Sequence, residues 1–321
     1  MVFRALPKQL QPVSHSTDSV VTPDLAASDT QPGRAALWMS GAIVSFTAMA
    51  IAGRAIQQEL DSFELMFWRS LIGFTIVVGV VLYSLRKPGR MLAEIRPTSP
   101  KLHLTRNLFH FAGQNLWFYG IMVIPLSQLV ALEFTMPIWV ALLAPLVLGE
   151  RFTLRRVMVT LLGFAGIVIV AQPGVQPLNT GHLAGMLCAI GFAMNVMLTK
   201  RIMRADSILC VLFWMTFSQT LFGLVLAQWG GFTWPPAAIW GWLGVVGVTG
   251  LSAHFALSSA LALAPASTVA PMEFLRLPVI ALVGVWLYAE ALEPLVFVGG
   301  GVILFANWVN LRNTNIRPRS S

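Results

Sequence analysis

A few charged side chains stand inside long apolar runs of this sequence. They are two carboxylates, Glu133 and Glu273, and two arginines, Arg69 and Arg276. A charge in a hydrocarbon layer costs at least about 2.5–3.5 kcal/mol on insertion scales, so such a residue faces a partner or a wet cavity. Carboxylates in this setting could exchange protons, and acid–base pairs could hold helices together. The four residues are therefore candidates for a site that binds or transports a solute.

The spacing of these charged residues allows two interpretations. Arg276 follows Glu273 by three residues, so the two side chains share one helix face. Glu133 lies roughly 10 Å along its predicted helix at 1.5 Å per residue, and Glu273 lies equally deep in a helix that starts from the opposite side. Each carboxylate could therefore sit near one gate of a cavity. Alternatively, Glu273–Arg276 and Arg69–Glu133 are structural ion pairs that hold helices together.

Polar residues on one predicted helix form a second candidate group. His110 and Gln114 lie four residues apart on one face, Trp117 follows them, and His254 aligns with Gln114 in the repeat described below. These side chains are expected either to line a cavity that binds a polar substrate or to form interhelical hydrogen bonds, worth about 0.6–2 kcal/mol each. The predicted substrate-binding and transport residues are therefore Arg69, His110, Gln114, Trp117, Glu133, His254, Glu273 and Arg276.

Motifs for catalysis or metal binding are missing from the sequence. It contains no His-Glu-x-x-His, no Gly-x-Ser-x-Gly and no Cys/His metal spacing, so we predict no catalytic residue, no metal and no cofactor. Cys188 and Cys210 both lie in apolar runs and are interpreted as packing residues.

The elements that must position these residues are helices in a membrane. Of the 321 residues, 56% are hydrophobic and only 11% are charged, whereas soluble domains carry about 25% charged residues. From Ala35 onward, apolar runs of about 20 residues follow one another, each long enough to cross a bilayer as a helix. We therefore predict an all-α integral membrane protein with ten transmembrane helices, after a disordered cytoplasmic tail at residues 1–33. The predicted spans are 35–56, 64–84, 102–123, 127–148, 153–171, 181–199, 208–229, 237–262, 267–288 and 293–311.

The distribution of basic residues predicts the orientation. All Lys and Arg residues except Arg54, Arg69 and Arg276 fall in the two tails and in alternate loops or their flanks, where they mark the cytoplasmic side. Both termini are therefore expected in the cytoplasm, in a multi-pass protein of the cytoplasmic (inner or plasma) membrane. The net charge of +8 is then a topology signal, and no nucleic-acid partner is expected.

The second half of the chain repeats the first. The stretch from Pro125 to Phe134 resembles the stretch from Pro265 to Phe274, at an offset of 140 residues without a gap. Each half would hold five helices, and because five is odd, the second half enters the membrane from the opposite side. This inverted-topology repeat is typical of secondary transporters. The predicted units are 34–172 and 173–311, followed by a cytoplasmic tail at 312–321.

Several motifs resemble those of EamA-type carriers of the drug/metabolite transporter superfamily. They are Phe67-Trp68-Arg69-Ser70-Leu71-Ile72-Gly73, Phe118-Tyr119-Gly120, Phe134-Thr135-Met136-Pro137, Leu148-Gly149-Glu150-Arg151, and the run from Ala264 to Phe274 with Glu290 ending the next helix. The resemblance covers about residues 36–311 and implies ten helices, a central cavity and transport of small metabolites, without implying one substrate. Ala289 departs from the family's pattern, which usually has Gly before the acid.

These observations predict a secondary transporter that works by alternating access. Its substrate would be a small metabolite such as an amino acid, a vitamin, a nucleoside-like compound or an S-adenosylmethionine-like solute. No Walker A motif is present, so the energy would come from proton or counter-substrate coupling, or transport would be facilitated. The alternatives are a membrane receptor or scaffold without transport and, as a further alternative, an intramembrane enzyme. The other expected partner is the lipid bilayer, and the protein is expected to be a monomer or a homodimer.

Overall fold

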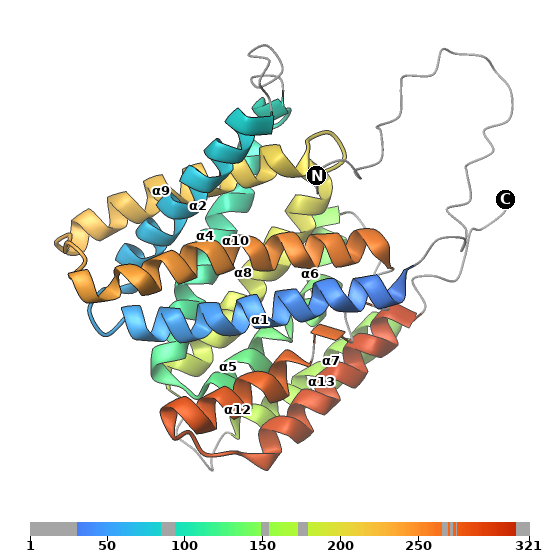
Figure 1. The fold of residues 1–321 in the computed structure, drawn as a ribbon. Coiled ribbons are helices and arrows are strands. Elements are labelled where there is room, and N and C mark those ends of the chain that lie inside the picture. Colours follow the sequence, from blue (N-terminus) through green and yellow to red (C-terminus); the bar gives the residue numbers. More distant parts are fainter. Residues whose placement is uncertain are drawn as a thin grey trace, which may run out of the picture. The chain divides into compact units, whose positions relative to one another are not determined.

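The computed structural model describes residues 31–84, 94–148, 154–172, 179–264, 269, 272–273 and 275–312. Within these ranges the regular structure is helical and contains no strand (Figure 1). Of the predicted tails at 1–33 and 312–321, residues 1–30 and 313–321 lie outside the described residues, while residues 32 and 33 belong to α1 and residue 312 to α13. The helices are α1 (Pro32–Ile56), α2 (Ser62–Ser84), α4 (Pro100–Val123), α5 (Leu126–Glu133), α6 (Met136–Leu148), α7 (Leu154–Ala171), α8 (Thr180–Ile202), α9 (Ile208–Gly230), the 3-10 helix η2 (Ala237–Ile239), α10 (Trp240–Leu263), α12 (Arg276–Tyr288) and α13 (Pro294–Arg312).

Six helical segments among the described residues are long and apolar enough to cross a membrane. They are Pro32–Ile56, Ser62–Tyr83, Leu126–Val147, Thr180–Ile202, Ile208–Gly230 and Ala237–Leu257, with shorter apolar helices at Thr160–Ala171, Arg276–Tyr288 and Pro294–Ala306. The prediction of a helical membrane protein agrees with this, while the count of ten spans stays a prediction. Helix α4 is the least apolar of the long helices because it buries several polar side chains, including His110, Gln114 and Asn115.

One predicted span is broken in the middle. The run 127–148 forms two helices, α5 and α6, which are separated at Phe134 and Thr135. The Thr135 hydroxyl donates a hydrogen bond to the Leu132 carbonyl at 2.6 Å, so it satisfies a carbonyl at the end of α5. Pro137 lies in the first turn of α6, where its missing N–H leaves no bond unmade. The break places Glu133 at the last position of α5.

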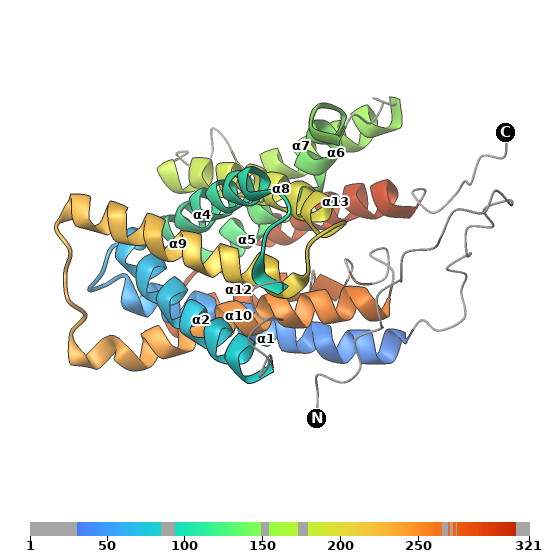
Figure 2. The same ribbon diagram turned by 90° about the horizontal axis from the view of Figure 1, so that it is seen from above.

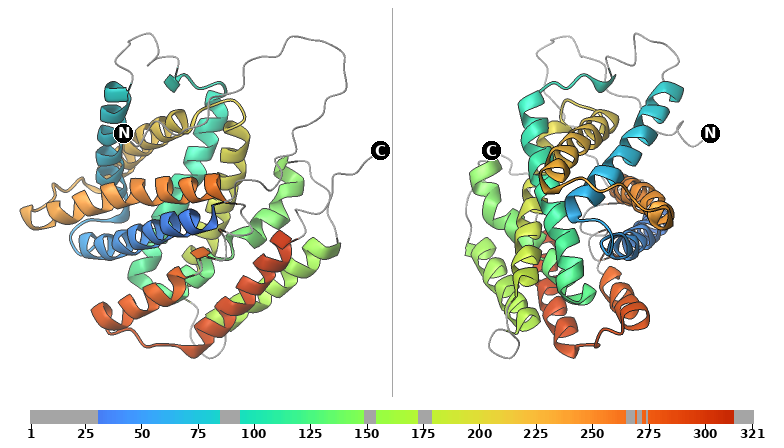
Figure 3. Two further views of the ribbon diagram at one scale, coloured as in Figure 1. Left: turned by 45° about the vertical axis from the view of Figure 1, so that its right-hand side comes forward. Right: turned by 90° about the vertical axis from the view of Figure 1, so that its left-hand side faces the viewer.

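The helices pack in pairs along their lengths. Helix α1 packs along α10, α2 along α9, α4 along α8, and α7 along α13 (Figures 1, 2 and 3). The last pair approaches through glycines, because a Cβ built on Gly299 would lie 2.7 Å from the Gly166 carbonyl oxygen. Small residues at a helix–helix contact let the two backbones approach this closely.

Candidate transport site

A buried ion pair joins α5 to α12. The Nη2 atom of Arg276, the first residue of α12, lies 2.7 Å from Oε1 of Glu133. The indole Nε1 of Trp117, on α4, donates a hydrogen bond of 2.9 Å to the other carboxylate oxygen. Only 3% of the Arg276 side chain and 15% of the Glu133 side chain are exposed. The contact between Glu133 and Arg276 is an ion pair only, because the geometry at Arg276 Nη2 does not meet that of a hydrogen bond.

Aromatic rings complete the surroundings of Arg276. Its guanidinium carbon lies 4.8 Å from the ring centre of Phe46 on α1 and 5.0 Å from that of Phe134. A guanidinium over an aromatic face is attracted by the negative face of the ring, and the attraction is larger when water is excluded. Four helices, α1, α4, α5 and α12, therefore contribute to holding this one cation or its carboxylate partner.

Glu273 belongs to the same group. It is half-buried, and its charge and that of Glu133 both act on Arg276. The sequence allowed either two separate gates or the ion pairs Glu273–Arg276 and Arg69–Glu133. In the structure Glu133 pairs with Arg276 and not with Arg69, and the charge of Glu273 also acts on Arg276. We call Trp117, Glu133, Glu273 and Arg276 the carboxylate site.

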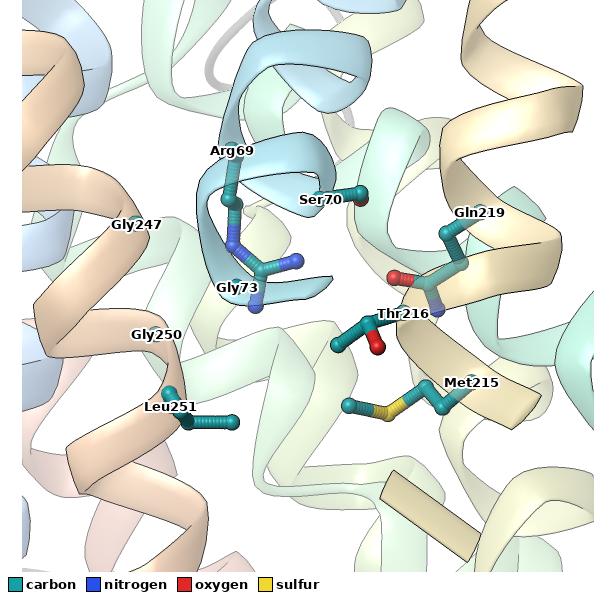
Figure 4. A pocket seen from close by; sticks show the side chains of 9 residues that line it. All are labelled: Arg69, Ser70, Gly73, Met215, Thr216, Gln219, Gly247, Gly250 and Leu251. Atoms are coloured by element: carbon teal, nitrogen blue, oxygen red, sulfur yellow. The ribbon is translucent and has the colours of Figure 1, made fainter. Parts of the chain in front are cut away.

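Three further predicted residues lie together in a second polar region. Gln219 Nε2 lies 2.6 Å from His110 Nδ1, and the rings of His110 and His254 meet edge to face at 5.5 Å. Arg69, on α2, lines a small cavity with Gln219 and carries its guanidinium into it (Figure 4). We call this the arginine cavity; it is lined by Arg69, Ser70, Gly73, Met215, Thr216, Gln219, Gly247, Gly250 and Leu251.

The carboxylate site and the arginine cavity are neighbours. The Phe46 ring, which stacks on Arg276, also meets the His254 ring edge to face at 5.7 Å. Gln114 is buried on α4, one turn beyond His110, and its Oε1 has no hydrogen-bond partner. The eight predicted residues therefore gather in one interior region, although their roles in transport stay predictions.

Sequence reasoning missed two residues of this region. Arg106 was counted with the basic residues of the cytoplasmic flank, but only 6% of it is exposed. Its guanidinium donates hydrogen bonds to Thr199 Oγ1 and Asn107 Oδ1, each of 3.0 Å. The positions 106, 110 and 114 are four apart, and this spacing could have placed Arg106 on the polar face of α4. Gln219 had no such signal, because its role comes from contact with another helix.

A second buried ion pair joins the helices away from the carboxylate site. Arg54 Nη1 lies 2.5 Å from Glu290 Oε1, and the other oxygen of Glu290 accepts a hydrogen bond from the Leu126 amide at 2.9 Å. The carboxylate thus caps the N-terminus of α5, where a negative charge is favoured. Ala289, just before this acid, adopts a left-handed backbone with φ of 51°. Glycine adopts a left-handed conformation without strain, and the family that the sequence resembles usually has glycine at this position.

A third polar group lies beside the turn between α8 and α9, at that end of the helix bundle. Asp206 accepts hydrogen bonds from the Thr98 amide and hydroxyl, and its Oδ2 lies 2.7 Å from His103 Nε2. Burial raises the pKa of Asp206, but the hydrogen bonds from Thr98 and His103 lower it further, to below its ordinary value. Cys210 lies close by, so three potential metal ligands are within 4.8 Å of one another. Because His103 Nε2 and Asp206 already bond to each other, we interpret the group as a structural tie between the helix ends.

Comparison with known proteins places these features in a class. A model of the EamA-like transporter family matches residues 33–172 and again residues 179–312. An all-helical chain with several apolar spans and a polar interior fits that match. The chain belongs to the EamA-like transporter family.

The chain is also similar to several named transporters. The chain is 26% identical over 267 residues to an S-adenosylmethionine uptake transporter of Rickettsia felis, covering 83% of this chain and 88% of the relative. It is 29% identical over 294 residues to a riboflavin transporter of Rhizobium johnstonii, covering 90% and 95%. A crystal structure matches with a TM-score of 0.59 at 17% identity, covering 88% of this chain and 99% of that one, which supports the fold alone. The chain is therefore similar over most of its length to transporters named for two different small metabolites.

Proposed function

We propose that this protein is a secondary transporter that moves a small metabolite by alternating access of two inverted five-helix halves. The observation that carries the proposal is the ion pair between Glu133 and Arg276 at 2.7 Å, buried inside an apolar bundle. The two residues belong to different halves of the proposed repeat. In alternating access the two halves move relative to each other, so an ion pair between them can form in one arrangement and break in the other.

The internal geometry supports an inverted repeat. Helices α6 and α12 both contain 13 residues, and they start at Met136 and Arg276, which the sequence offset relates to each other. The helix pairings are also consistent with an exchange of the halves. In the proposed repeat α1 corresponds to α8, and α4 corresponds to α10. Exchanging the two halves then converts the α1–α10 pair into the α8–α4 pair, and both pairs are present.

The helix breaks supply a mechanism. Glu133 is the last residue of α5 and Arg276 is the first residue of α12, so the ion pair bridges two helix ends. Broken helices are where many secondary transporters bind substrates and ions, and their ends can reorient without unfolding a helix. Protonation of Glu133 or Glu273 would weaken the attraction to Arg276 and would couple the rearrangement to a proton gradient.

The proposal includes the setting of the protein. It lies in the cytoplasmic membrane with both termini in the cytoplasm, as the basic residues favour. S-Adenosylmethionine and riboflavin are the first candidate substrates, because relatives are named as their transporters. Since those relatives are transporters, we also infer that this chain is not an enzyme.

Flux through the purified full-length protein in liposomes tests the proposal. Uptake of radiolabelled S-adenosylmethionine or riboflavin above that of protein-free liposomes is expected, with saturation at high concentration. A Glu133→Gln variant should reduce this uptake, whereas Glu59→Gln, an exposed acid outside both sites, should not. Saturable binding without uptake would favour a receptor, and a chemically altered product would favour an enzyme.

A further inference from the structure

Arg69 is a buried cation without a partner. Only 5% of it is exposed, and its Nε atom has no hydrogen-bond partner. No ion pair to Arg69 is present within the described part of the chain, whereas Arg54 and Arg276 each have a carboxylate within 2.7 Å. Removing an unpaired guanidinium from water is costly, so a residue of this kind is retained where something else supplies the counter-charge.

The cavity beside Arg69 is small, with room for about one water-sized group. Its guanidinium extends into a cavity between α2, α9 and α10, with Thr216 and Gln219 on the opposite wall (Figure 4). The α10 wall is open because Gly250 has no side chain; a Cβ there would lie 2.7 Å from Arg69 Nε. Ser70 Oγ is buried without a hydrogen-bond partner beside the same cavity. The cavity therefore offers a cation and unused hydrogen-bonding groups at one place.

The electrostatic surroundings of the cavity are positive. No carboxylate is found among the described residues that line it. The nearest polar region contains a second buried arginine, Arg106, which donates hydrogen bonds to the neutral side chains of Thr199 and Asn107. Both arginines act on His110, which meets Gln219 at the cavity wall. An anion placed in this cavity would be attracted by two buried cations, while a second cation would be repelled.

We infer that the substrate carries a carboxylate and that the arginine cavity binds this group through Arg69. A carboxylate presents two oxygens that match the two parallel N–H donors of a guanidinium, so the pair forms with both charge and direction. The unpartnered Ser70 hydroxyl and the second amide hydrogen of Gln219 supply the remaining hydrogen bonds, because the Thr216 hydroxyl already donates to the Leu212 carbonyl. The inference rests on the proposed transport function and narrows its substrate class. Of the two candidate substrates, only S-adenosylmethionine has a carboxylate, in its amino-acid part, and its ammonium and sulfonium groups would have to lie outside the cavity. Riboflavin has no carboxylate.

Matched pairs of probes test the inference on the full-length protein in liposomes. S-Adenosylmethionine is compared with its decarboxylated form, and each of the common amino acids with its methyl ester, with riboflavin as a probe that lacks an anion. We expect uptake of at least one carboxylate and little uptake of its partner. Arg69→Met should raise the KM of that carboxylate about 10- to 100-fold, as loss of a charge-assisted bidentate pair does, and Arg69→Lys should raise it less.

Two glycine variants on α10 supply matched controls. Gly250→Ala places a methyl group against Arg69 and should also raise the KM, whereas Gly244→Ala meets nothing within 4 Å and should leave it unchanged. All variants are first compared by elution profile and thermal midpoint. Because Gly250→Ala keeps the arginine, it tests the cavity even if Arg69→Met does not fold.

The outcomes separate this inference from the proposed function. Uptake of riboflavin or of esters equal to that of the carboxylates, or an unchanged KM in Arg69→Met, overturns the inference and leaves transport intact. Absence of uptake for every probe overturns the transport function itself. If chloride alone stabilises the wild type but not Arg69→Met in a thermal-shift titration, the anion is an inorganic ion and the substrate assignment is wrong.

Discussion

The carboxylate site and the arginine cavity each bury an arginine inside an apolar bundle, but the two arginines differ in their neighbours. Arg276 has Glu133 at 2.7 Å and two aromatic rings within 5.0 Å, and Trp117 holds the carboxylate in place. Arg69 lines a cavity and has no carboxylate partner within the described ranges. The Phe46 ring lies between the two regions, in contact with both Arg276 and His254.

This difference separates two uses of the same residue type. A paired arginine holds helices in one arrangement, and removing its partner leaves a buried charge that the protein cannot compensate. An unpaired buried arginine lowers the free energy of unfolding of the empty protein, and binding of an anion raises it again. The carboxylate site therefore suits a contact between the halves, and the arginine cavity suits a ligand.

The largest effect is expected at the carboxylate site. Glu133→Ala should lower the free energy of unfolding by about 3–5 kcal/mol, because it removes the carboxylate that contacts the buried Arg276. Unfolding of the purified variant in detergent, followed by heat or denaturant, measures this. The exposed control Glu59→Ala should stay within about 0.5 kcal/mol of the wild type. A loss at Glu133 no greater than the loss at Glu59 would mean that the pair does not stabilise the fold.

The opposite sign is expected at the arginine cavity. Arg69→Met should keep the free energy of unfolding of the empty protein or raise it by about 1–3 kcal/mol, because an uncompensated charge is replaced by an apolar side chain of similar length. The same unfolding assay without substrate measures the change. If Arg69→Met is as destabilised as Glu133→Ala, then Arg69 has a structural partner and the contrast between the two sites disappears.

A smaller gain is expected at the far end of the helix that carries Arg276. Ala289 follows α12 in a left-handed conformation, which costs an L-residue roughly 1–2 kcal/mol. Ala289→Gly should therefore stabilise the protein by up to about 1 kcal/mol after the greater flexibility of glycine in the unfolded chain is subtracted. An unchanged or lower thermal midpoint would show that α12 is not strained at this end.

The smallest effect is expected at Asp206, which lies outside both sites. Because hydrogen bonds hold its pKa below the ordinary value in the folded protein, it stabilises the fold above the ordinary pKa of about 4 and loses that contribution as the pH falls through its lowered pKa. The difference in thermal midpoint between wild type and Asp206→Asn should be constant near pH 7 and shrink in acid. A difference that grows in acid would contradict the assignment.

Much of the fold followed from the sequence because apolar length decides where helices span a bilayer. The predicted boundaries of α1, α8 and α9 lie within about three residues of the observed ones. The break before Pro137 was missed, because an apolar run conceals a helix end that is satisfied by the Thr135 hydroxyl. A proline near the start of a second helix was the signal available.

The site was predicted as a set of residues but not as a set of partners. Charges inside apolar runs identified Glu133 and Arg276, since burying them is costly. Their pairing with each other depends on how two helices from different halves cross, and residue spacing within a helix does not contain this information. One interpretation of the sequence paired Arg69 with Glu133, but Glu133 contacts Arg276, because the packing of helices decides which charged residues meet.

The pairing of helices also has a consequence for how the chain assembles. The principal partners of α1, α2, α4 and α7 are α10, α9, α8 and α13, and each of these partners comes after residue 179. Synthesis proceeds from the N-terminus, so each of these early helices is made before the helix it packs against. The partner of α7 is α13, which is made last. Contacts so distant in sequence are slow to form and leave polar and glycine-lined surfaces open meanwhile. A nascent chain cut off at residue 172 would therefore keep its unmatched surfaces facing lipid, as a substrate for membrane quality control.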